Sequence, residues 1–268
     1  MKTPLPLSVS IIAKNEAENL KRCLKSLRGI AKEIILVHND CTDETVKTGK
    51  SFGAKCLENA WQGYIEQKNF ALSKCSEDWI LSIDADEALS GKLKDSIQAF
   101  LRQEKASENY DGALFCRCSF FLGRWIRHGD WYPDKKVRLV RKGKARWVGT
   151  NPHDKMKIKG KGACKLLKGD LLHYSYGSLR EIPSKAIKYS DLYLENQCPP
   201  AKPPSLVISG VARPLWRFFR AYVLRFGILD GAAGFIIAFS TAYETMIRHG
   251  RQWERSHVAK RTKEDFEK

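Results

Sequence analysis

An apolar run that ends in two closely spaced carboxylates constrains the fold of this chain more than any other feature. Residues 79–83 read Trp-Ile-Leu-Ser-Ile, and Asp84-Ala85-Asp86 follows directly. A continuous apolar run of this length is typical of a strand buried in a parallel sheet. Ligands of open α/β sheets bind at the carboxyl ends of strands. Because Mg²⁺ and Mn²⁺ take carboxylate and phosphate oxygens, the pattern indicates a divalent cation that links the protein to a nucleotide diphosphate. Acidic strand ends are common, so the triplet alone has low specificity.

Strands and helices alternate over the first half of the chain. Apolar runs predict strands at 7–13, 33–37, 54–57 and 80–83, and the intervening segments predict helices at 15–27, before residue 52, at 62–74 and at 89–103. This alternation predicts a parallel, doubly wound sheet. In the second half, strand-like segments at 113–121, 136–141, 145–148 and 169–174 no longer alternate with helices. We therefore expect an α/β fold in which these strands complete a mixed sheet.

A proline-rich segment marks the clearest domain boundary. Residues 199–204 read Pro-Pro-Ala-Lys-Pro-Pro, and four prolines in six residues exclude a helix there. We therefore expect an α/β domain over 1–198, a linker over 199–204 and a basic, amphipathic helical extension over 205–268.

The extension contains two apolar helical segments. Arg213–Arg225 predicts an amphipathic helix with arginines on one face and aromatic residues on the other. Gly231–Tyr243 is a second apolar run, and its 13 residues are fewer than the roughly 20 that span a bilayer. Such a region fits an anionic membrane surface, with apolar faces at the headgroup boundary and arginines on the lipid. The alternative is that it packs on the α/β domain or in a dimer.

Composition limits the location and the partners. A formal net charge of +17 indicates a partner rich in negative charge, either nucleic acid or an anionic membrane surface. The hydrophobic fraction of 43% argues against wholesale disorder. The eight cysteines show no Cys-x-x-Cys pair and no zinc-like spacing with histidine, so we expect reduced thiols. With no signal peptide visible, we expect a cytoplasmic protein.

Several ordered motifs resemble the bacterial family 2 glycosyltransferases of the GT-A fold. The matching segments are Ser10–Ala17, Cys41–Thr45, Gln67–Ala71 and Asp84–Glu87, and Trp131–Asp134, the Leu139 region, Gly169–His173 and Leu229–Gly231 extend the match. The later segments are similar to the branch that contains lipopolysaccharide core glucosyltransferases. The resemblance covers nearly the whole chain. It implies a GT-A (nucleotide-diphospho-sugar transferase) fold, a nucleotide-sugar donor linked to UDP, and a glycan or lipid-linked acceptor such as lipopolysaccharide core.

The resemblance also implies roles at the donor site. Asn15 and Glu16 would lie beside the base and ribose, although both residue types also favour helix N-termini. Lys68 would meet the diphosphate or the base; the alternative is a solvated charge on a helix. Asp86 would bind Mg²⁺ or Mn²⁺, and Asp84 would reach the ribose or the same cation.

The end of the second strand departs from the family pattern. The family usually places an aspartate there, before a Ser-Gly-Ser-Thr-Asp loop, whereas this chain has His38-Asn39-Asp40. An imidazole can donate or accept a hydrogen bond, unlike a carboxylate. Either Asp40 replaces the aspartate or recognition of the base differs. The departure bears on the identity of the nucleotide rather than on the reaction class.

The base that deprotonates the acceptor hydroxyl is expected in the second half of the chain. We hypothesise that it is Asp134, near Trp131 and Tyr132, which would stack on sugars or pack in the core. Asp154 is the competing candidate, and it follows His153 where relatives usually carry His-Glu. His153 would complete the metal shell, or it is structural. Direct displacement by the activated hydroxyl would invert an α-linked donor to a β-linked product.

Two other function classes stay open at this point. Basic clusters at 135–146 and 155–168 would suit a nucleic-acid-binding protein, but no helix-turn-helix, zinc-finger or aromatic RNP-type motif accompanies them. A nucleotidyltransferase would also use paired carboxylates, but no glycine-rich phosphate loop is present. A relative that binds without catalysing is a further alternative. We expect a metal-dependent hexosyltransferase at the inner face of the cytoplasmic membrane, with no nucleic-acid partner.

Overall fold

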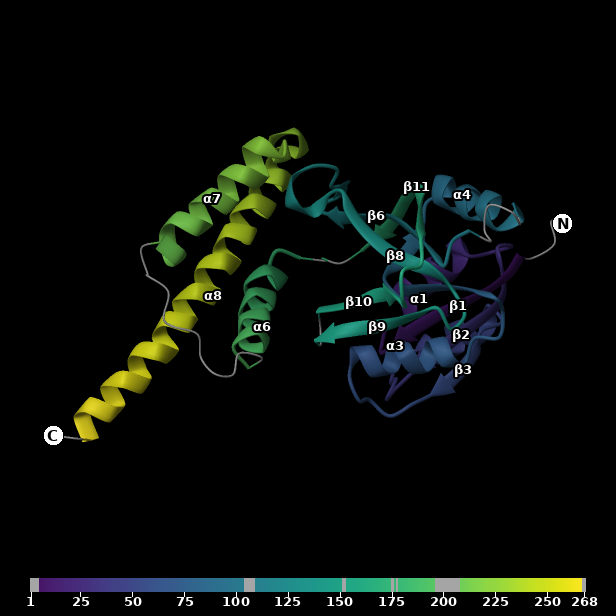
Figure 1. The fold of residues 1–268 in the computed structure, drawn as a ribbon, viewed down its shortest axis with the longest axis horizontal. Helices are drawn as coiled ribbons and strands as arrows, with labels where there is room; N and C mark the ends of the chain where they lie inside the picture. The colour runs from purple at the N-terminus through teal and green to yellow at the C-terminus, as the bar shows by residue number, and fades with distance from the viewer. Residues whose placement is uncertain are drawn as a thin grey trace. The chain divides into compact units, whose positions relative to one another are not determined.

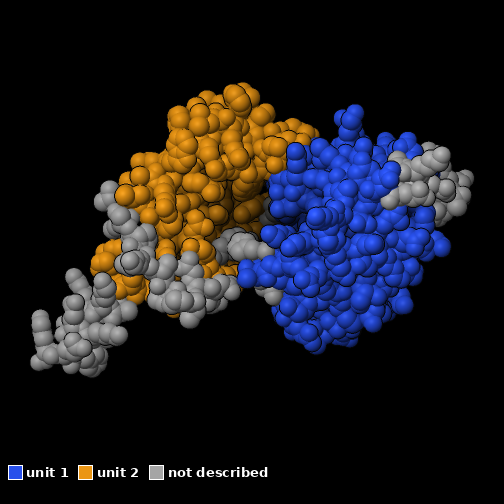
Figure 2. Space-filling view, in the orientation of Figure 1, with its two compact units in different colours: residues 1–119, 134–175 blue, residues 120–133, 176–268 orange. Residues whose placement is uncertain are grey.

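The computed structural model describes residues 5–103, 109–150, 153–174, 176, 178–195 and 208–266 (Figure 1). The chain divides into two compact units, coloured separately in Figure 2. Unit 1 comprises Met1–Ser119 and Asp134–Ser175, and unit 2 comprises Phe120–Pro133 and Tyr176–Lys268. The linker expected at 199–204 lies outside the described residues, so that domain boundary stays a prediction.

Unit 1 is built on one mixed sheet with order β3-β2-β1-β4-β8-β6-β11-β5. Its strands are β1 (Leu5–Ala13), β2 (Ala31–His38), β3 (Lys55–Glu58), β4 (Trp79–Asp84), β5 (Glu87–Leu89), β6 (Gly112–Phe121), β8 (Asp134–Arg141) and β11 (Cys164–His173). β3, β2, β1 and β4 are parallel, as are β6 and β11, whereas β8 and β5 run antiparallel to their neighbours. The predicted mixed sheet is therefore confirmed.

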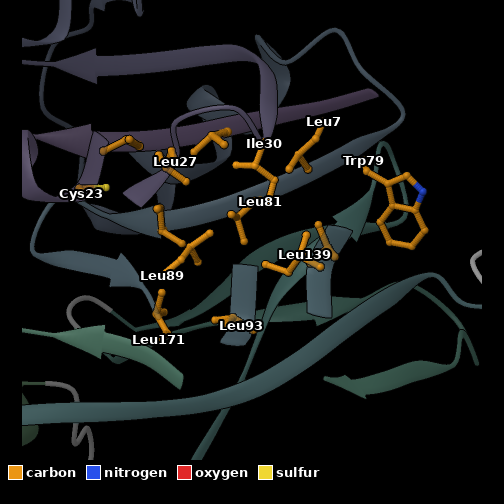
Figure 3. Close-up of a cluster of buried hydrophobic side chains, with 14 of the residues drawn as sticks. Leu7, Cys23, Leu27, Ile30, Trp79, Leu81, Leu89, Leu93, Leu139 and Leu171 are labelled. Atoms are coloured by element: carbon orange, nitrogen blue, oxygen red, sulfur yellow. The ribbon is translucent and has the colours of Figure 1, made fainter. Parts of the chain in front are cut away.

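Side chains of successive strand residues enter opposite layers of unit 1 because they point to opposite faces of the sheet. The helices are α1 (Ala17–Ser26), α2 (Thr45–Ser51), α3 (Tyr64–Ser73) and α4 (Gly91–Arg102). Leu81 of β4 packs with α1 and α4, in the cluster shown in Figure 3. Its neighbour Ile80 packs instead with α3 and Trp147. Both faces of the sheet are covered, which explains why the strands read as continuous apolar runs.

The candidate residues gather at one edge of this sheet. Strand register places Ala13 of β1 opposite His38 of β2, and Ile12 opposite Asp84 of β4. Further along the strand order, at the same edge, His173 of β11 pairs with Glu87 of β5. These are the carboxyl ends of β1, β2, β4 and β11, where an open α/β sheet collects its ligands.

Some elements of unit 1 were not predicted from the sequence. β5 is only three residues long. It begins directly after the Asp-x-Asp triplet and forms by pairing with β11. The strand predicted at 145–148 forms as β9 (Ala145–Thr150), but it lies outside the mixed sheet and pairs antiparallel with β10 (His153–Ile158), a lysine-rich strand that was not predicted. β10 carries Asp154, so this pairing decides where the second candidate base lies.

Unit 2 is mostly helical. It contains β7 (Arg124–Trp125), η1 (Gly129–Trp131), α6 (Glu181–Glu195), η2 (Ile208–Ala212), α7 (Arg213–Phe219), η3 (Arg220–Leu224), η4 (Gly227–Asp230) and α8 (Gly231–Phe266). The expected helix at Arg213–Arg225 begins earlier, at Ile208, and has π-helical turns at both ends. The apolar run at Gly231–Tyr243 forms only the first part of α8.

Within the described residues, no single helix is both long and apolar enough to cross a bilayer. Ile208–Leu224 and Gly227–His257 meet the criteria together, as a pair bent by 73° at the break between them. We call these two stretches the bent helix pair.

Candidate functional site

Asp84 lies at the end of β4 between two buried cations. Lys68 Nζ of α3 is 2.8 Å from Asp84 Oδ1, and Arg138 Nη2 of β8 is 3.0 Å from Asp84 Oδ2. Burial would raise the pKa of Asp84, but Lys68 and Arg138 hold that pKa well below its usual range. The carboxylate is therefore ionised, with each of its oxygens paired to a cation.

Lys68 connects Asp84 to the second candidate base. Its Nζ atom is 2.8 Å from Asp154 Oδ2 and lies over the ring of Trp147, 4.3 Å from the centroid. Burial would lower the pKa of Lys68, but attraction to Asp84 and Asp154 outweighs that effect and raises it. The side chain is 7% exposed, so Lys68 is not the solvated helix charge that was the alternative.

Sequence reasoning did not single out Arg138 and Glu87, which complete this cluster. Glu87 is fully buried; its carboxylate accepts a hydrogen bond from Arg138 Nη2 (2.9 Å) and from the backbone N–H of Asp84 (2.9 Å). Within the described part of the chain, Arg138 Nε and Nη1 are buried without a hydrogen-bond partner. A signal existed in the sequence, since an arginine inside the apolar run Val137–Val140 must find a partner when it is buried.

Asp86 faces His173, which belongs to one of the family-like motifs but had no predicted role. Asp86 Oδ2 is 3.3 Å from His173 Nε2, and the backbone carbonyl of Asp86 accepts a hydrogen bond from Tyr174 N. The pairing of β5 with β11 brings these residues together. Among the described residues, no group of three or more His, Cys, Asp or Glu side chains could hold a metal ion. A cation at Asp86 and His173 would need phosphate and water ligands, as Mg²⁺ commonly takes.

The turn after β1 links two loops at the edge of the sheet. Asn15 has a left-handed backbone (φ 54°), and its Oδ1 atom accepts a hydrogen bond from Thr42 N at 2.8 Å. Asp43 Oδ2 accepts from Ala17 N in the first turn of α1. Asn15 therefore has a structural role in joining these loops, and Asp43 satisfies a helix N-terminus that the sequence reading assigned to Asn15 and Glu16.

Glu16 adds to the negative potential around Asp86. Burial raises the pKa of Glu16, and the charges of Asp86 and Asp43 act in the same direction against a hydrogen bond from Asn19. A divalent cation beside Asp86 would offset this repulsion. Glu16 therefore lies within electrostatic reach of the predicted metal position.

His38 and Asp40 lie at the end of β2, as predicted. His38 is partly buried, while Asp40 is exposed with a left-handed backbone (φ 43°) and lies 3.6 Å from Lys14 Nζ. Asn39 is 4% exposed and donates a hydrogen bond to Asp40 Oδ2. Which of them reads the nucleotide stays a prediction.

The two candidate bases differ in environment. Asp134 begins β8 and is partly exposed. Its carboxylate accepts a hydrogen bond from Arg117 Nε (3.0 Å) and forms ion pairs with Arg117 Nη2 (2.8 Å) and Lys136 Nζ (3.0 Å). Asp154 is 90% buried in the ion pair with Lys68. His153 begins β10, but its side chain lies outside the described part of the structure. Trp131 stacks on Tyr176 with ring centroids 5.2 Å apart, which is the packing alternative for that residue.

Comparison with known proteins identifies the family of this chain. The family described as Glycosyl transferase family 2 matches residues 8–156, more than half of the chain. An uncharacterized glycosyltransferase of Rickettsia bellii (strain RML369-C) is 32% identical over 255 residues, which cover 90% of this chain and 84% of the relative. The lipopolysaccharide core biosynthesis glycosyltransferase LpsC of Rhizobium meliloti (strain 1021) is 30% identical over 257 residues, with coverage of 91% and 93%.

Solved structures give weaker likenesses. TarS 1-349 of S. aureus is 14% identical with a TM-score of 0.48, covering 91% of each chain. Glucosyl-3-phosphoglycerate synthase of Mycobacterium tuberculosis, solved with Mn²⁺, UDP and glucosyl-3-phosphoglycerate, is 22% identical with a TM-score of 0.33, covering 44% of this chain and 45% of the other. The assignment depends on the sequence matches: the chain is a glycosyltransferase with a mixed GT-A-like sheet, and it belongs to glycosyl transferase family 2.

Proposed function

We propose that this glycosyltransferase moves a hexose from a UDP-linked donor to a glycan or lipid-linked acceptor of the lipopolysaccharide core type. The observation that carries the proposal is the pairing of Asp86 with His173 at the carboxyl edge of the sheet. The name of the Rhizobium meliloti relative supports the acceptor class. An acceptor of this kind would place the enzyme at the inner face of the cytoplasmic membrane, and the net charge of +17 favours an anionic lipid surface there.

Asp86 and His173 fit a divalent cation because they offer one carboxylate and one imidazole 3.3 Å apart. When bound, Mg²⁺ or Mn²⁺ would offset the charge that develops on the leaving diphosphate. Asp84 has both oxygens paired with cations, which favours the ribose role over direct metal binding. The predicted contact of His153 with the cation stays a prediction.

Asp134 is the base we favour for the acceptor hydroxyl. Arg117 holds this carboxylate from the neighbouring strand through one hydrogen bond and one ion-pair contact, which fixes its orientation while leaving it partly exposed. Asp154 is instead buried, and its carboxylate is paired with Lys68, which favours a structural role for it. Attack by the activated hydroxyl on the anomeric carbon would invert its configuration.

The metal site is tested by titration calorimetry of UDP with and without Mn²⁺. We expect Mn²⁺ to raise the affinity of the wild-type protein by about tenfold or more. Asp86→Ala and His173→Ala should each remove most of that gain. Asp78→Ala is the matched control, because Asp78 is an exposed carboxylate one residue before β4 begins. Equal UDP affinity with and without Mn²⁺ in wild type, together with unchanged binding by Asp86→Ala, would contradict the proposed site.

The base is tested by UDP release from a panel of UDP-sugars in the presence of core oligosaccharide. Asp134→Asn should lose about 10²–10⁴-fold in turnover, since a positioned base contributes that much. Its affinity for UDP and Mn²⁺ should stay close to wild type. Wild-type turnover in Asp134→Asn would show that the assignment is wrong, and selective loss in Asp154→Asn with normal stability would transfer the role to Asp154.

A further inference from the structure

The bent helix pair of unit 2 exposes an apolar stripe along its first half. The stripe repeats every three or four residues, so its members share one face of the helix. They are Ile208 (59% exposed), Val211 (54%), Leu215 (65%), Phe219 (46%) and Val223 (44%). Trp216 (55%) and Leu224 (50%) lie beside them. A folded domain in water normally buries such a stripe.

Apolar side chains continue across the break and onto α8. Phe226, Ile228 and Leu229 are 53–61% exposed at the break, where a loop in water is usually polar. Phe235 and Phe239 are 47% and 60% exposed, and Phe235 packs edge-on against Phe218 and Tyr222. We call these exposed side chains together the apolar surface. Monomeric proteins rarely expose large apolar patches unless they bind something.

The arginines of the same helices point to an acidic centre inside unit 2. Asp130 is 7% exposed, and its carboxylate lies 2.7 Å from Arg220 Nη2, 3.2 Å from Arg225 Nη1 and 3.7 Å from Arg217 Nη2. Arg217 and Arg220 pair with Asp130 but stay 38% and 34% exposed, so the expected contact of the arginine face with anionic lipid stays a prediction. Large apolar side chains of the same helices are also left exposed.

The break between the two helices is held by specific buried contacts. Asp230 is 2% exposed, and its Oδ2 atom accepts hydrogen bonds from the backbone N–H groups of Arg127 and His128. A Cβ on Gly234 would lie 1.8 Å from the carbonyl oxygen of Gly227, so only glycine permits this close approach. Substitutions on the apolar surface leave these contacts in place.

We propose that the apolar surface inserts into one leaflet of an anionic bilayer. The bent helix pair meets the length and composition criteria of a span only as a pair, and Gly231–Tyr243 reaches about 20 Å, less than the roughly 30 Å of a hydrocarbon core. Insertion to the depth of one leaflet fits both facts. Residues 208–255 contain seven arginines, no lysine and three acidic residues, which complements anionic headgroups. Trp216 fits the interface, where tryptophan is enriched.

The test uses the full-length protein and flotation with vesicles, either of phosphatidylcholine alone or with added phosphatidylglycerol. We expect the wild-type protein to float with both, and more strongly with the anionic mixture. The double variant L215E/F219E should lose at least about tenfold in partitioning. Leu166→Glu is the matched control, because Leu166 of β11 is a leucine with comparable exposure (51%) in unit 1. Bromine-labelled acyl chains should quench wild-type tryptophan fluorescence more than that of Trp216→Phe.

Three outcomes would overturn the inference. Wild type could stay in the aqueous fraction, the double variant could float as well as wild type, or binding could require phosphatidylglycerol and disappear with salt regardless of Leu215 and Phe219. A dimer that depends on the same residues, with no vesicle binding, would identify a second copy as the occupant instead. The inference deepens the membrane part of the proposed function but not its chemistry, because UDP and Mn²⁺ binding by L215E/F219E should equal wild type whether or not the surface binds lipid.

Discussion

Unit 1 and unit 2 both bury charge, but they distribute apolar residues in opposite ways. In unit 1, Lys68, Asp84 and Arg138 form a buried ion-pair cluster at the rim of an apolar core, and the core side chains are hidden. In unit 2, the buried carboxylate of Asp130 pairs with three partly exposed arginines, while large apolar side chains face outward. The comparison teaches that pairing a charge and hiding a hydrophobic side chain are separate requirements. Unit 1 meets both requirements, whereas unit 2 pairs its charges but leaves large apolar side chains exposed.

The largest expected effect is in the buried cluster of unit 1. Arg138→Met should lower the free energy of unfolding by about 3–5 kcal/mol, because it leaves Asp84 and Glu87 with one fewer cation in a buried site. Arg138 also helps to hold the pKa of Asp84 below its usual range. The stability from Asp84 is therefore complete above about pH 4 and is lost as the pH falls, so the variant should lose much of this acid dependence.

Chemical denaturation at several pH values measures both effects. Lys135→Met is the control, since Lys135 is exposed on the same strand and its loss should change stability by less than about 0.5 kcal/mol. If Arg138→Met and Lys135→Met are equally stable, the cluster does not hold unit 1 together, and the comparison between the units fails on that side.

A smaller effect is expected in unit 2. Asp130→Asn should cost about 2 kcal/mol, because three arginines lose their shared carboxylate but are themselves one-third to one-half exposed. Asp191→Asn is matched to it, since Asp191 pairs with Arg251 at an exposed site and should cost less than about 1 kcal/mol. Thermal unfolding of the two variants separates a buried acidic centre from a surface ion pair. Equal melting temperatures would show that Asp130 does not organise the helices.

The smallest expected effect is a gain in stability at Glu16. Burial and the charges of Asp86 and Asp43 raise the pKa of Glu16, so the folded state binds its proton more tightly than the unfolded state. The resulting stability is present below the ordinary glutamate pKa of about 4.3 and is lost as the pH rises through the folded pKa. Glu16→Gln should therefore be slightly more stable than wild type at pH 7, by less than about 1 kcal/mol.

Melting temperatures measured between acidic and neutral pH provide this test. Saturating Mn²⁺ with UDP should reduce the advantage of the Gln variant, since a cation near Asp86 would stabilise the Glu16 carboxylate. A Gln variant that is less stable than wild type at pH 7 would mean that Glu16 is favourably paired and is not repelled by Asp86.

Much of unit 1 was predictable because its signals are local. Continuous apolar runs give β1, β2 and β4, and the position of Asp84 and Asp86 after β4 follows from where that run ends. His173 was quoted as part of a motif but not assigned, because its partner Asp86 lies 87 residues earlier and meets it only through the pairing of β5 with β11. Asp154 could not be placed either, since the lysine-rich β10 becomes a strand only against β9.

The sequence by itself determined the family, the alternation of strands and helices, and the acidic triplet that ends β4. These follow from short-range patterns, because the period of a strand or helix is written into neighbouring residues. Only the tertiary structure decided which charges pair: Lys68 with Asp84 and Asp154, and Asp130 with the arginines of unit 2. The local sequence around a charged residue is the same whether water or a distant partner solvates its side chain, so the fold alone decides its partner.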